Sequence, residues 1–484
     1  MGDSSLRLHR PFCRLSLAVA GRKLLAGAKK KRRPKGEDAI DTLSNMPKKK
    51  RLPVVIAILL CGLILPGCWD KRELDQYAFV LSMGVDLGPQ EEIELTVRIS
   101  IPSSLTAQAG RGGVSSPAEV SKVITATGRT IPEAMSHLDS QVERQVSYMH
   151  CRTVLLGEKI AQHGIVPYLD VFNRYREFRR ALFVFIVKDV AVRDIFMNTT
   201  PVLETNVARY LESIATSEER TDYAPVTRLL DINRTIEEYH VDTVISVFAL
   251  NDQILKEKPD SKVKPRPTPE FRKDGTETPG VEPETSAGHL HRSGGNPLEY
   301  IGSAVFIGGK LVTYMDGAEN RIWSMLIGRY NTGLWTFPDP HQPGKYVSMR
   351  LNHGDPLRVT VDDSVHPIRI EVKVELDGTI VEISSRKPYA TPEGFRDMEA
   401  FINRELNSQA IRLVKRMQKI PADPFQFVRT LRMRTLTTGE YWNIPWREWF
   451  RDAEFIADIH VHVRRPGYQV QPDEPLKQEE HLVR

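Results

Sequence analysis

Residues 368–376 alternate apolar and charged side chains without a break, and this pattern constrains the fold more than any other stretch of the chain. Successive residues of a strand point to opposite faces of a sheet, so such a segment folds as a strand with one buried and one wet face. Asp377-Gly378 follows directly and suits a type I′ turn. We therefore predict a half-buried hairpin with a second strand at residues 379–384.

A long amphipathic helix is predicted at residues 392–419. Thr391 supplies an N-cap hydroxyl, and Pro392 occupies the first helical position. The apolar residues recur at helical spacing and form a stripe: Phe395, Met398, Ile402, Leu406, Ile411, Leu413 and Met417. A last strand with clean alternation is predicted at residues 456–464, with one face on the core and the other wet.

The N-terminal half combines short strands with amphipathic helices. The predicted order is strand, strand, helix, strand, helix, strand, at residues 77–86, 92–101, 130–146, 153–156, 160–173 and 181–188. Gly88-Pro89 makes the first two strands a hairpin, and Thr130 is the expected N-cap of the first helix. The expected fold class is α+β and multi-domain, with mixed or antiparallel sheets and packed helices.

Composition changes sharply in the middle of the chain. Residues 191–255 are mostly helical in pattern and end in a strand at 241–250, whereas residues 256–297 hold seven prolines and few apolar side chains. Such a stretch cannot bury enough surface to offset its ordering entropy, so it is predicted to be a flexible linker or loop. Beyond it, residues 300–314 predict a hairpin that turns at Gly308-Gly309.

The expected cellular location of the chain follows from a basic segment that is followed by an apolar one. From Met46 it reads MPKKKRLPVVIAILLCGLILPGC, and the apolar run of residues 52–65 is shorter than the roughly 20 residues that span a bilayer. A basic start, an apolar middle and small residues before the end are the parts of a secretory signal. We expect this segment to be removed, and an uncleaved signal anchor is the alternative.

The end of this segment resembles a bacterial lipobox, formed by Leu65, Pro66, Gly67 and Cys68. In such sites a diacylglyceryl group is attached to the cysteine sulfur, the chain is cut before the cysteine, and N-acylation can follow. The small Gly67 admits the peptidase, and only a thiol can form the thioether. Cys68 is therefore the predicted lipidation site and the membrane anchor.

Most of the positive charge lies before Cys68. Residues 1–67 carry 15 Lys and Arg against four acids, and residues 68–484 carry 52 bases and 58 acids, a net charge of −6. Because binding of a polyanion needs an excess of cations at the contact, a nucleic-acid partner is not expected. The basic stretch of residues 29–35 could also be a nuclear-localisation or nucleic-acid patch, but Met46 is a natural start, and residues 1–45 are better explained as a leader that is disordered or foreign to the native protein.

These observations divide the chain into seven segments. We expect a basic leader at 1–45, a lipoprotein signal peptide at 46–67, an N-terminal α+β domain at 68–190, a middle helical and β region at 191–255, a flexible Pro-rich linker or loop at 256–297, a C-terminal α+β domain at 298–466 and a polar tail at 467–484.

Residue types that carry catalysis or bind metals are sparse. The four cysteines, Cys13, Cys61, Cys68 and Cys151, have no metal-ligand spacing, and a lone Cys151 is typical of a small buried side chain. His460 and His462 share a face of the last strand, but no third ligand lies nearby; His289 and His291 are weaker candidates still. No phosphate loop, GxSxG elbow or HExxH helix occurs, so we expect no enzyme activity, no catalytic residue, no metal and no cofactor.

Two groups of tryptophans suggest different roles. Trp442, Trp446 and Trp449 span about two helical turns, a spacing that favours core packing over a partner-binding edge. Trp69 stands beside the predicted anchor and must lie near lipid headgroups, which tryptophan prefers. We therefore expect contacts with the membrane or a partner from four residues of this segment: Trp69, Asp70, Glu73 and Leu74.

Several motifs resemble the Ger(x)C family of spore germination lipoproteins. Cys68 opens the family signature CWDKREL, and the resemblance continues through Gly84-Val85-Asp86 and GSAVFIGGKL at residues 302–311. It ends with ADPF at 422–425, WNIPWREW at 442–449 and the strand that closes at RRPG, residues 464–467. These pieces occur in the family's order over residues 68 to about 470, although the linker is unusually long and ADPF replaces an aromatic and Gly-rich stretch.

The resemblance implies a lipid-anchored, non-enzymatic subunit of a nutrient germinant receptor on the outer face of the spore inner membrane. Its implied partners are a membrane-embedded A-type subunit and a transporter-like B-type subunit, together with membrane lipid through Cys68. A substrate-binding lipoprotein that serves a transporter is the alternative, but it would need two similar lobes, and the chain shows no internal repeat. A wall- or lipid-modifying enzyme would need a convergent polar pocket.

Overall fold

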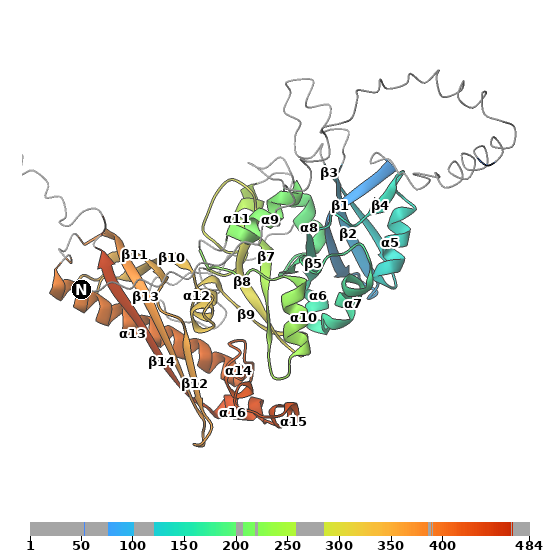
Figure 1. Ribbon diagram of the computed structural model, residues 1–484. Coiled ribbons are helices and arrows are strands. Elements are labelled where there is room, and N and C mark those ends of the chain that lie inside the picture. Colours follow the sequence, from blue (N-terminus) through green and yellow to red (C-terminus); the bar gives the residue numbers. More distant parts are fainter. Residues whose placement is uncertain are drawn as a thin grey trace, which may run out of the picture. The chain divides into compact units, whose positions relative to one another are not determined.

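The computed structural model describes residues 53, 76–100, 121–199, 207–217, 221–257, 285–385, 389, 391–465 and 467. The described residues from Gln76 onward belong to one compact unit. This unit combines helices with sheets of mixed strand direction, which confirms the predicted α+β class (Figure 1). Nearly all of the predicted leader, signal peptide and polar tail lies outside the described residues.

In the described part of the chain, the larger sheet has nine strands in the order β3-β2-β1-β5-β6-β7-β8-β9, with β4 beside β1. The strands are β1 (Tyr77–Leu87), β2 (Ile93–Ser100), β3 (Ser121–Gly128), β4 (Gln145–Ser147), β5 (Thr153–Gly157), β6 (Phe183–Val187), β7 (Thr243–Leu250), β8 (Leu298–Ile307) and β9 (Lys310–Met315). The central pairs are parallel and the outer pairs antiparallel. One sheet thus crosses the domain boundaries expected after residues 190 and 255.

Helices pack on both faces of the larger sheet. One core contains side chains of α5 (Ile131–Asp139), α6 (Glu158–His163), α7 (Val166–Arg174) and α10 (Leu229–Glu237), and the other contains side chains of α8 (Val192–Asn198), α9 (Val207–Ser217) and α11 (Asp252–Glu257). Every residue of β5 and β6 is buried, and alternate residues enter opposite cores. Their uninterrupted apolar sequences are typical of parallel strands covered on both faces.

Two predicted helices of this half are shorter than expected. Thr130 caps α5 by accepting the Glu133 N–H, as predicted, but the helix ends at Asp139 and the chain enters β4 at residue 145. The predicted helix at 160–173 is two helices, α6 and α7, because Gly164 adopts a positive φ of 120° between them. The hairpins β1–β2 and β8–β9 are confirmed, the latter with Gly308 and Gly309 both at positive φ.

The smaller sheet contains β10 (Thr332–Pro338), β11 (Tyr346–His353), β12 (Arg358–Asp362), β13 (Arg369–Ile383) and β14 (Glu454–Arg465), where β14 runs parallel to β13. The predicted turn at Asp377-Gly378 is wrong, because β13 continues through it. Gly378 pairs with Leu351 on one side and Val463 on the other. A Cβ on Gly378 would meet Met349 Cε at 2.9 Å, so this glycine serves a close approach of neighbouring side chains rather than a turn.

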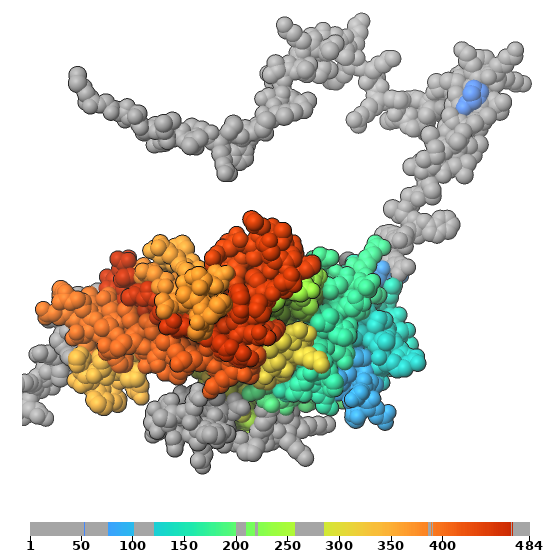
Figure 2. All heavy atoms as spheres, turned by 90° about the horizontal axis from the view of Figure 1, so that it is seen from below, coloured from blue at the N-terminus to red at the C-terminus, as the bar shows by residue number. Residues whose placement is uncertain are grey.

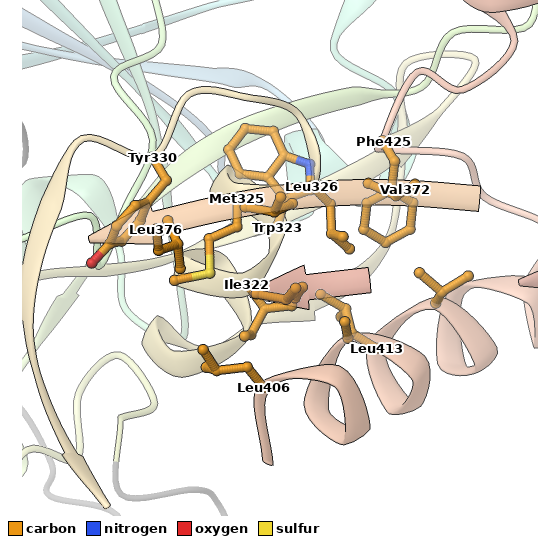
Figure 3. Close-up of a cluster of buried hydrophobic side chains, with 14 of the residues drawn as sticks. Ile322, Trp323, Met325, Leu326, Tyr330, Val372, Leu376, Leu406, Leu413 and Phe425 are labelled. Carbon is orange, nitrogen blue, oxygen red and sulfur yellow. The ribbon is translucent and has the colours of Figure 1, made fainter. Parts of the chain in front are cut away.

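Two helices cover the inner face of the smaller sheet. The predicted helix at 392–419 is α13 (Pro392–Lys419), and Thr391 caps it by accepting the Gly394 N–H. α12 (Gly317–Leu326) begins at a capping box in which Asp316 and Glu319 bond each other's backbone N–H. Figure 3 shows Trp323 and Leu326 of α12 near Val372 of β13 and Leu413 of α13, in one core. Three short helices follow: α14 (Arg429–Arg432), α15 (Thr438–Trp442) and α16 (Trp446–Asp452).

Side chains of α13 also protect the outer edge of β14. Glu399, Asn403 and Asn407 follow one another at four-residue spacing and accept the backbone N–H groups of Val463, Val461 and Ile459 at 2.7–2.8 Å. The amide of Asn407 returns a hydrogen bond to the Ile459 carbonyl at 3.1 Å. These contacts satisfy backbone groups that an unprotected edge strand would offer to another chain.

The predicted linker differs from the structure at its C-terminal end. Residues 285–297 of that segment belong to the folded body, where Ala287 and His289 are buried. Gly288 donates its backbone N–H to Glu299 Oε2 at 2.6 Å, and Asn251 donates to Glu299 Oε1 at 2.5 Å. Residues 258–284 lie outside the described residues.

Candidate functional site

The predicted anchor and its neighbours lie outside the described residues. These are Leu65, Pro66, Gly67, Cys68, Trp69, Asp70, Glu73 and Leu74. The described chain begins again at Gln76, one residue before β1. Within the stretches that the structure describes, no helix has the length and apolarity to cross a bilayer.

Two of the histidine candidates, His460 and His462, each lie beside one carboxylate. His462 Nε2 lies 2.8 Å from Glu375 Oε2, and His460 Nε2 lies 2.6 Å from Asp458 Oδ1. Among the described residues, no group of three or more His, Cys, Asp or Glu side chains is arranged to hold a metal ion. Cys151 is buried, as predicted, and burial raises the pKa of its thiol to about 12.

The C-terminal tryptophans divide between the core and the surface. Trp446 is fully buried and Trp449 packs against the same core, so core packing is confirmed for these two. The prediction is wrong for Trp442, which is 50% exposed and stacks on Tyr239 with ring centroids 4.9 Å apart. Tyr239 follows α10, so this stack joins two segments that lie about 200 residues apart in sequence.

A buried charged cluster lies beside this stack. Arg447 of α16 donates from both terminal nitrogens to Asp242, at 2.9 and 3.2 Å, and also to the Pro421 carbonyl at 2.9 Å. Asp242 Oδ2 also accepts the backbone N–H of Asp423 at 2.8 Å. Asp242 and Asp423 are each 1% exposed. The cluster therefore ties the start of β7 to the segment between α13 and α14.

The electrostatics of this cluster depend on its burial. Asp423 accepts the indole N–H of Trp446 at 2.9 Å and the backbone N–H of Phe425 at 3.1 Å. Even so, burial, with the added charge of Asp242, raises the pKa of Asp423 to about 7. Burial also raises the pKa of Asp242, and Arg447 opposes that rise. Arg447 thus pairs with Asp242, while N–H groups of Trp446 and Phe425 hold Asp423. Because every one of these contacts is used to join segments of the fold, the cluster is a structural clamp rather than a reaction centre.

A second polar contact joins the same two segments near the surface. Glu238 accepts from Arg429 at 2.6 Å and from Arg432 at 2.9 Å, and the Tyr441 hydroxyl donates to the Tyr239 carbonyl at 3.0 Å. Burial opposes ionisation of Glu238, but the two arginines hold its pKa below the usual value. These hydrogen bonds therefore hold the segment after α10 against α14 and α15.

The two segments form the walls of an open groove of about 920 Å³. α10 and Tyr239 make one wall, and residues 432–442 make the other. Figure 2 looks onto the face that carries α14, α15 and α16, drawn in orange-red. Polar residues line much of the groove, and the apolar or aromatic ones are Leu230, Tyr239, Leu436, Tyr441 and Trp442. We take this groove as the candidate functional site of the described chain.

Only part of this site was predictable from local sequence patterns. The WNIPWREW segment drew attention to Trp442 and Trp446, but nothing local indicates that Asp242 meets Arg447 across 205 positions. The available signal was the pair of acids Asp242 and Asp423, each placed next to apolar segments where a carboxylate needs a partner.

Two family models match the chain in succession. The model described as "Spore germination protein N-terminal domain" matches residues 70–250, and the model described as "Spore germination B3/ GerAC like, C-terminal" matches residues 301–467. The walls of the groove come from these two regions, α10 from the first and residues 432–442 from the second. The clamp Asp242–Arg447 likewise joins one region to the other.

Curated relatives cover most of the chain. The protein YfkR of Bacillus subtilis (strain 168) is 26% identical over 418 residues, which is 86% of this chain and 95% of that protein. Spore germination protein KC of the same organism is 23% identical over 426 residues, or 87% of this chain and 97% of that protein. The crystal structure of the GerBC protein aligns with a TM-score of 0.46 at 14% identity and covers 79% of this chain and 96% of that one.

Proposed function

The chain belongs to the Ger(x)C family of spore germination proteins, and on that premise we propose that it is the lipid-anchored, non-enzymatic subunit of a nutrient germinant receptor. The proposed anchor is an S-diacylglyceryl group on Cys68, at the outer face of the spore inner membrane. The proposed partners are a membrane-embedded A-type subunit and a transporter-like B-type subunit. This subunit would be required for germination that nutrients trigger.

The order of the motifs along the chain carries this proposal. The first family model begins at residue 70, two positions after the lipobox-like cysteine, and the second ends at 467. A diacylglyceryl group would supply two acyl chains, the number that stable anchoring needs. Trp69, Asp70, Glu73 and Leu74 would then form a short tether in contact with headgroups or with a partner subunit.

The state of the titratable groups supports a role without catalysis. Asp423 is sealed in the clamp. Glu319, whose pKa burial and Asp316 raise to about 7, lines a cavity of about 340 Å³ but is committed to the N-terminus of α12 and to Arg416, 2.6 Å away. Both carboxylates with strongly raised pKa values therefore hold helices in place.

The alternative, a substrate-binding lipoprotein, is less well supported. Such proteins close two similar lobes around a ligand. In the described part of the chain, the larger sheet is mixed and covered by helices on both faces, whereas α12 and α13 cover one face of the smaller sheet. The two sheets therefore do not form a pair of matched lobes among the described residues, and the groove opens at the surface beside the clamp.

Replacing the anchor cysteine tests the proposal. Cys68→Ala should leave unprocessed precursor or release the protein from spore membranes, and nutrient-triggered germination should fail. Cys61→Ala, seven positions earlier in the apolar run, is the matched control and should preserve both. A Cys68→Ala protein that stayed processed, membrane-bound and active would contradict the anchor.

Removing the partner subunits tests the receptor assignment separately. Without them, the chain should lose its normal level or its normal protease resistance in spores. Identical level, placement and protease sensitivity with and without the partners would favour the binding-lipoprotein alternative.

Mass spectrometry of the native protein also tests the expected start at Met46, which a peptide from residues 1–45 would contradict.

A further inference from the structure

The rim of the groove carries a group of unusually exposed apolar side chains. Leu436 is 93% exposed and Met433 is 83% exposed, and Leu230, Tyr239 and Trp442 are each at least half exposed. Four of these five line the groove, and Met433 lies in the same loop as Leu436. Single apolar residues on a surface need no explanation, but a cluster of them marks a contact surface.

The loop that bears Met433 and Leu436 is held so that these side chains stay outside. Leu436 donates its backbone N–H to Glu440 at 3.0 Å, and Thr437 forms a capping box with the same glutamate. On the other side, Arg434 donates to the Val361 carbonyl at 3.0 Å and pairs with Asp363 at 2.9 Å. The exposed tips are therefore a fixed feature of the fold.

The distribution of polarity shows what this surface can contact. An amphipathic helix in a groove needs apolar residues inside the groove. Here the groove is lined by Asn173 and Asn233, which exchange hydrogen bonds, and by the ion pair of Glu238 with Arg432, while Leu436 and Met433 are the most exposed apolar side chains of the group. Apolar side chains that project from the surface can insert into a fluid layer such as a lipid bilayer.

Two arginines of the groove lining fit a surface of phosphate groups. Arg180 and Arg234 line the groove, are exposed, and form no ion pair within the described part of the chain. Apolar tips, aromatic rings and arginines are the combination that binds the interface of an anionic bilayer. The net acidity of residues 68–484 does not prevent this, because at physiological salt charges act over only about 8 Å.

We propose that this rim rests on the lipid bilayer, with Leu436 and Met433 entering the headgroup region, Tyr239 and Trp442 at its surface, and Arg180 and Arg234 on lipid phosphates. The proposal rests on the membrane location in the proposed function. The anchor and the rim would then be two points of membrane contact, and together they would set the orientation of both family regions on the bilayer.

A photo-crosslinker placed at position 436 tests this contact directly. The full chain with Leu436→benzoylphenylalanine is irradiated in spore inner membranes and analysed by mass spectrometry. The expected result is an adduct with the mass of one phospholipid. Leu334 of β10, which is 52% exposed, is the control position and should give no lipid adduct.

The adduct found at position 436 shows whether lipid or protein contacts the rim. A protein adduct without a lipid adduct would overturn the proposal in favour of a protein partner, and a membrane-bound chain with no adduct would overturn it as well. A chain absent from the membrane fraction would instead refute the anchor, so the two failures are distinguishable. As a second readout, Met433→Ser with Leu436→Ser should weaken flotation of the Cys68→Ala chain that is recovered processed and free of the membrane, with vesicles that contain phosphatidylglycerol, and equal flotation would also count against the proposal.

Discussion

The two sheets of this protein show two ways in which a strand can be buried. β5 and β6 of the larger sheet bury every residue and feed two cores, whereas β13 of the smaller sheet buries alternate residues and leaves the others wet. The larger sheet thus depends on packing from both faces. The smaller one depends on one face, on polar protection of its edge by α13, and on the clamp that joins it to β7.

Alanine substitutions at consecutive positions should separate the two sheets most strongly. Phe185→Ala and Ile186→Ala in β6 should each lower the free energy of unfolding by about 2–5 kcal/mol, because each leaves a cavity in a different core. In β13, Ile370→Ala should have a similar effect, but Glu371→Ala should change it by less than about 0.5 kcal/mol. Urea unfolding of the four variants measures this, and a large effect of Glu371→Ala would contradict the one-sided burial.

The clamp between the two regions gives the next largest effect. Arg447→Met leaves Asp242 buried without its cation, and we expect a loss of about 3 kcal/mol. Arg451 lies one turn further along α16 and pairs with Asp452 at the surface. Arg451→Met is therefore the matched control and should be nearly neutral. A nearly neutral Arg447→Met would show that Arg447 acts only as a surface charge.

Protection of the edge of β14 should have a smaller effect. Asn403→Leu leaves the N–H of Val461 without its acceptor, so we expect a loss of about 1–3 kcal/mol. The exposed edge should also make the variant self-associate, which sedimentation would detect. Arg404→Ala, at the neighbouring exposed position of α13, is the control. A stable and monodisperse Asn403→Leu protein would show that α13 does not protect this edge.

Local patterns predicted several elements of both regions but not β3, β10, β11 and β12, and contacts between distant segments account for part of what they missed. Alternation predicted β13 and β14, and the cap at Thr391 placed the start of α13 correctly. Asp377-Gly378 was misread as a turn because its glycine is required by Met349, a neighbour on β11 that no local pattern shows. The parallel pairing of β13 with β14 likewise depends on chain closure across about 80 residues.

The candidate site was predictable only in outline. The tryptophan spacing correctly indicated a core position for Trp446, but the exposure of Trp442 follows from Tyr239, on a distant segment. A signal for the edge protection was present in the sequence, since Glu399, Asn403 and Asn407 form a polar row at four-residue spacing within an amphipathic helix. Only the position of β14 shows what that row bonds.

The last and smallest expected effect is a pH dependence, and it arises where the two regions meet. Burial raises the pKa of Asp423 to about 7, whereas an aspartate in the unfolded chain titrates near about 4. Between these values the native state retains a proton that the unfolded state has released, so the stability that this group contributes is complete below about pH 4 and is lost as the pH rises toward 7.

Asp423→Asn cannot titrate, and its free energy of unfolding should therefore fall less steeply over this range than that of the unmodified chain. Glu319, with a pKa raised in the same direction, accounts for part of the slope that remains. Asp452→Asn is the control, because Arg451 holds the pKa of Asp452 below its usual value and so below this window. Urea unfolding at a series of pH values measures the slopes. Equal slopes for Asp423→Asn and the unmodified chain would mean that Asp423 is ionised in the native protein and that Arg447 serves both acids, which would make the clamp an ion-pair network rather than a proton-holding pair.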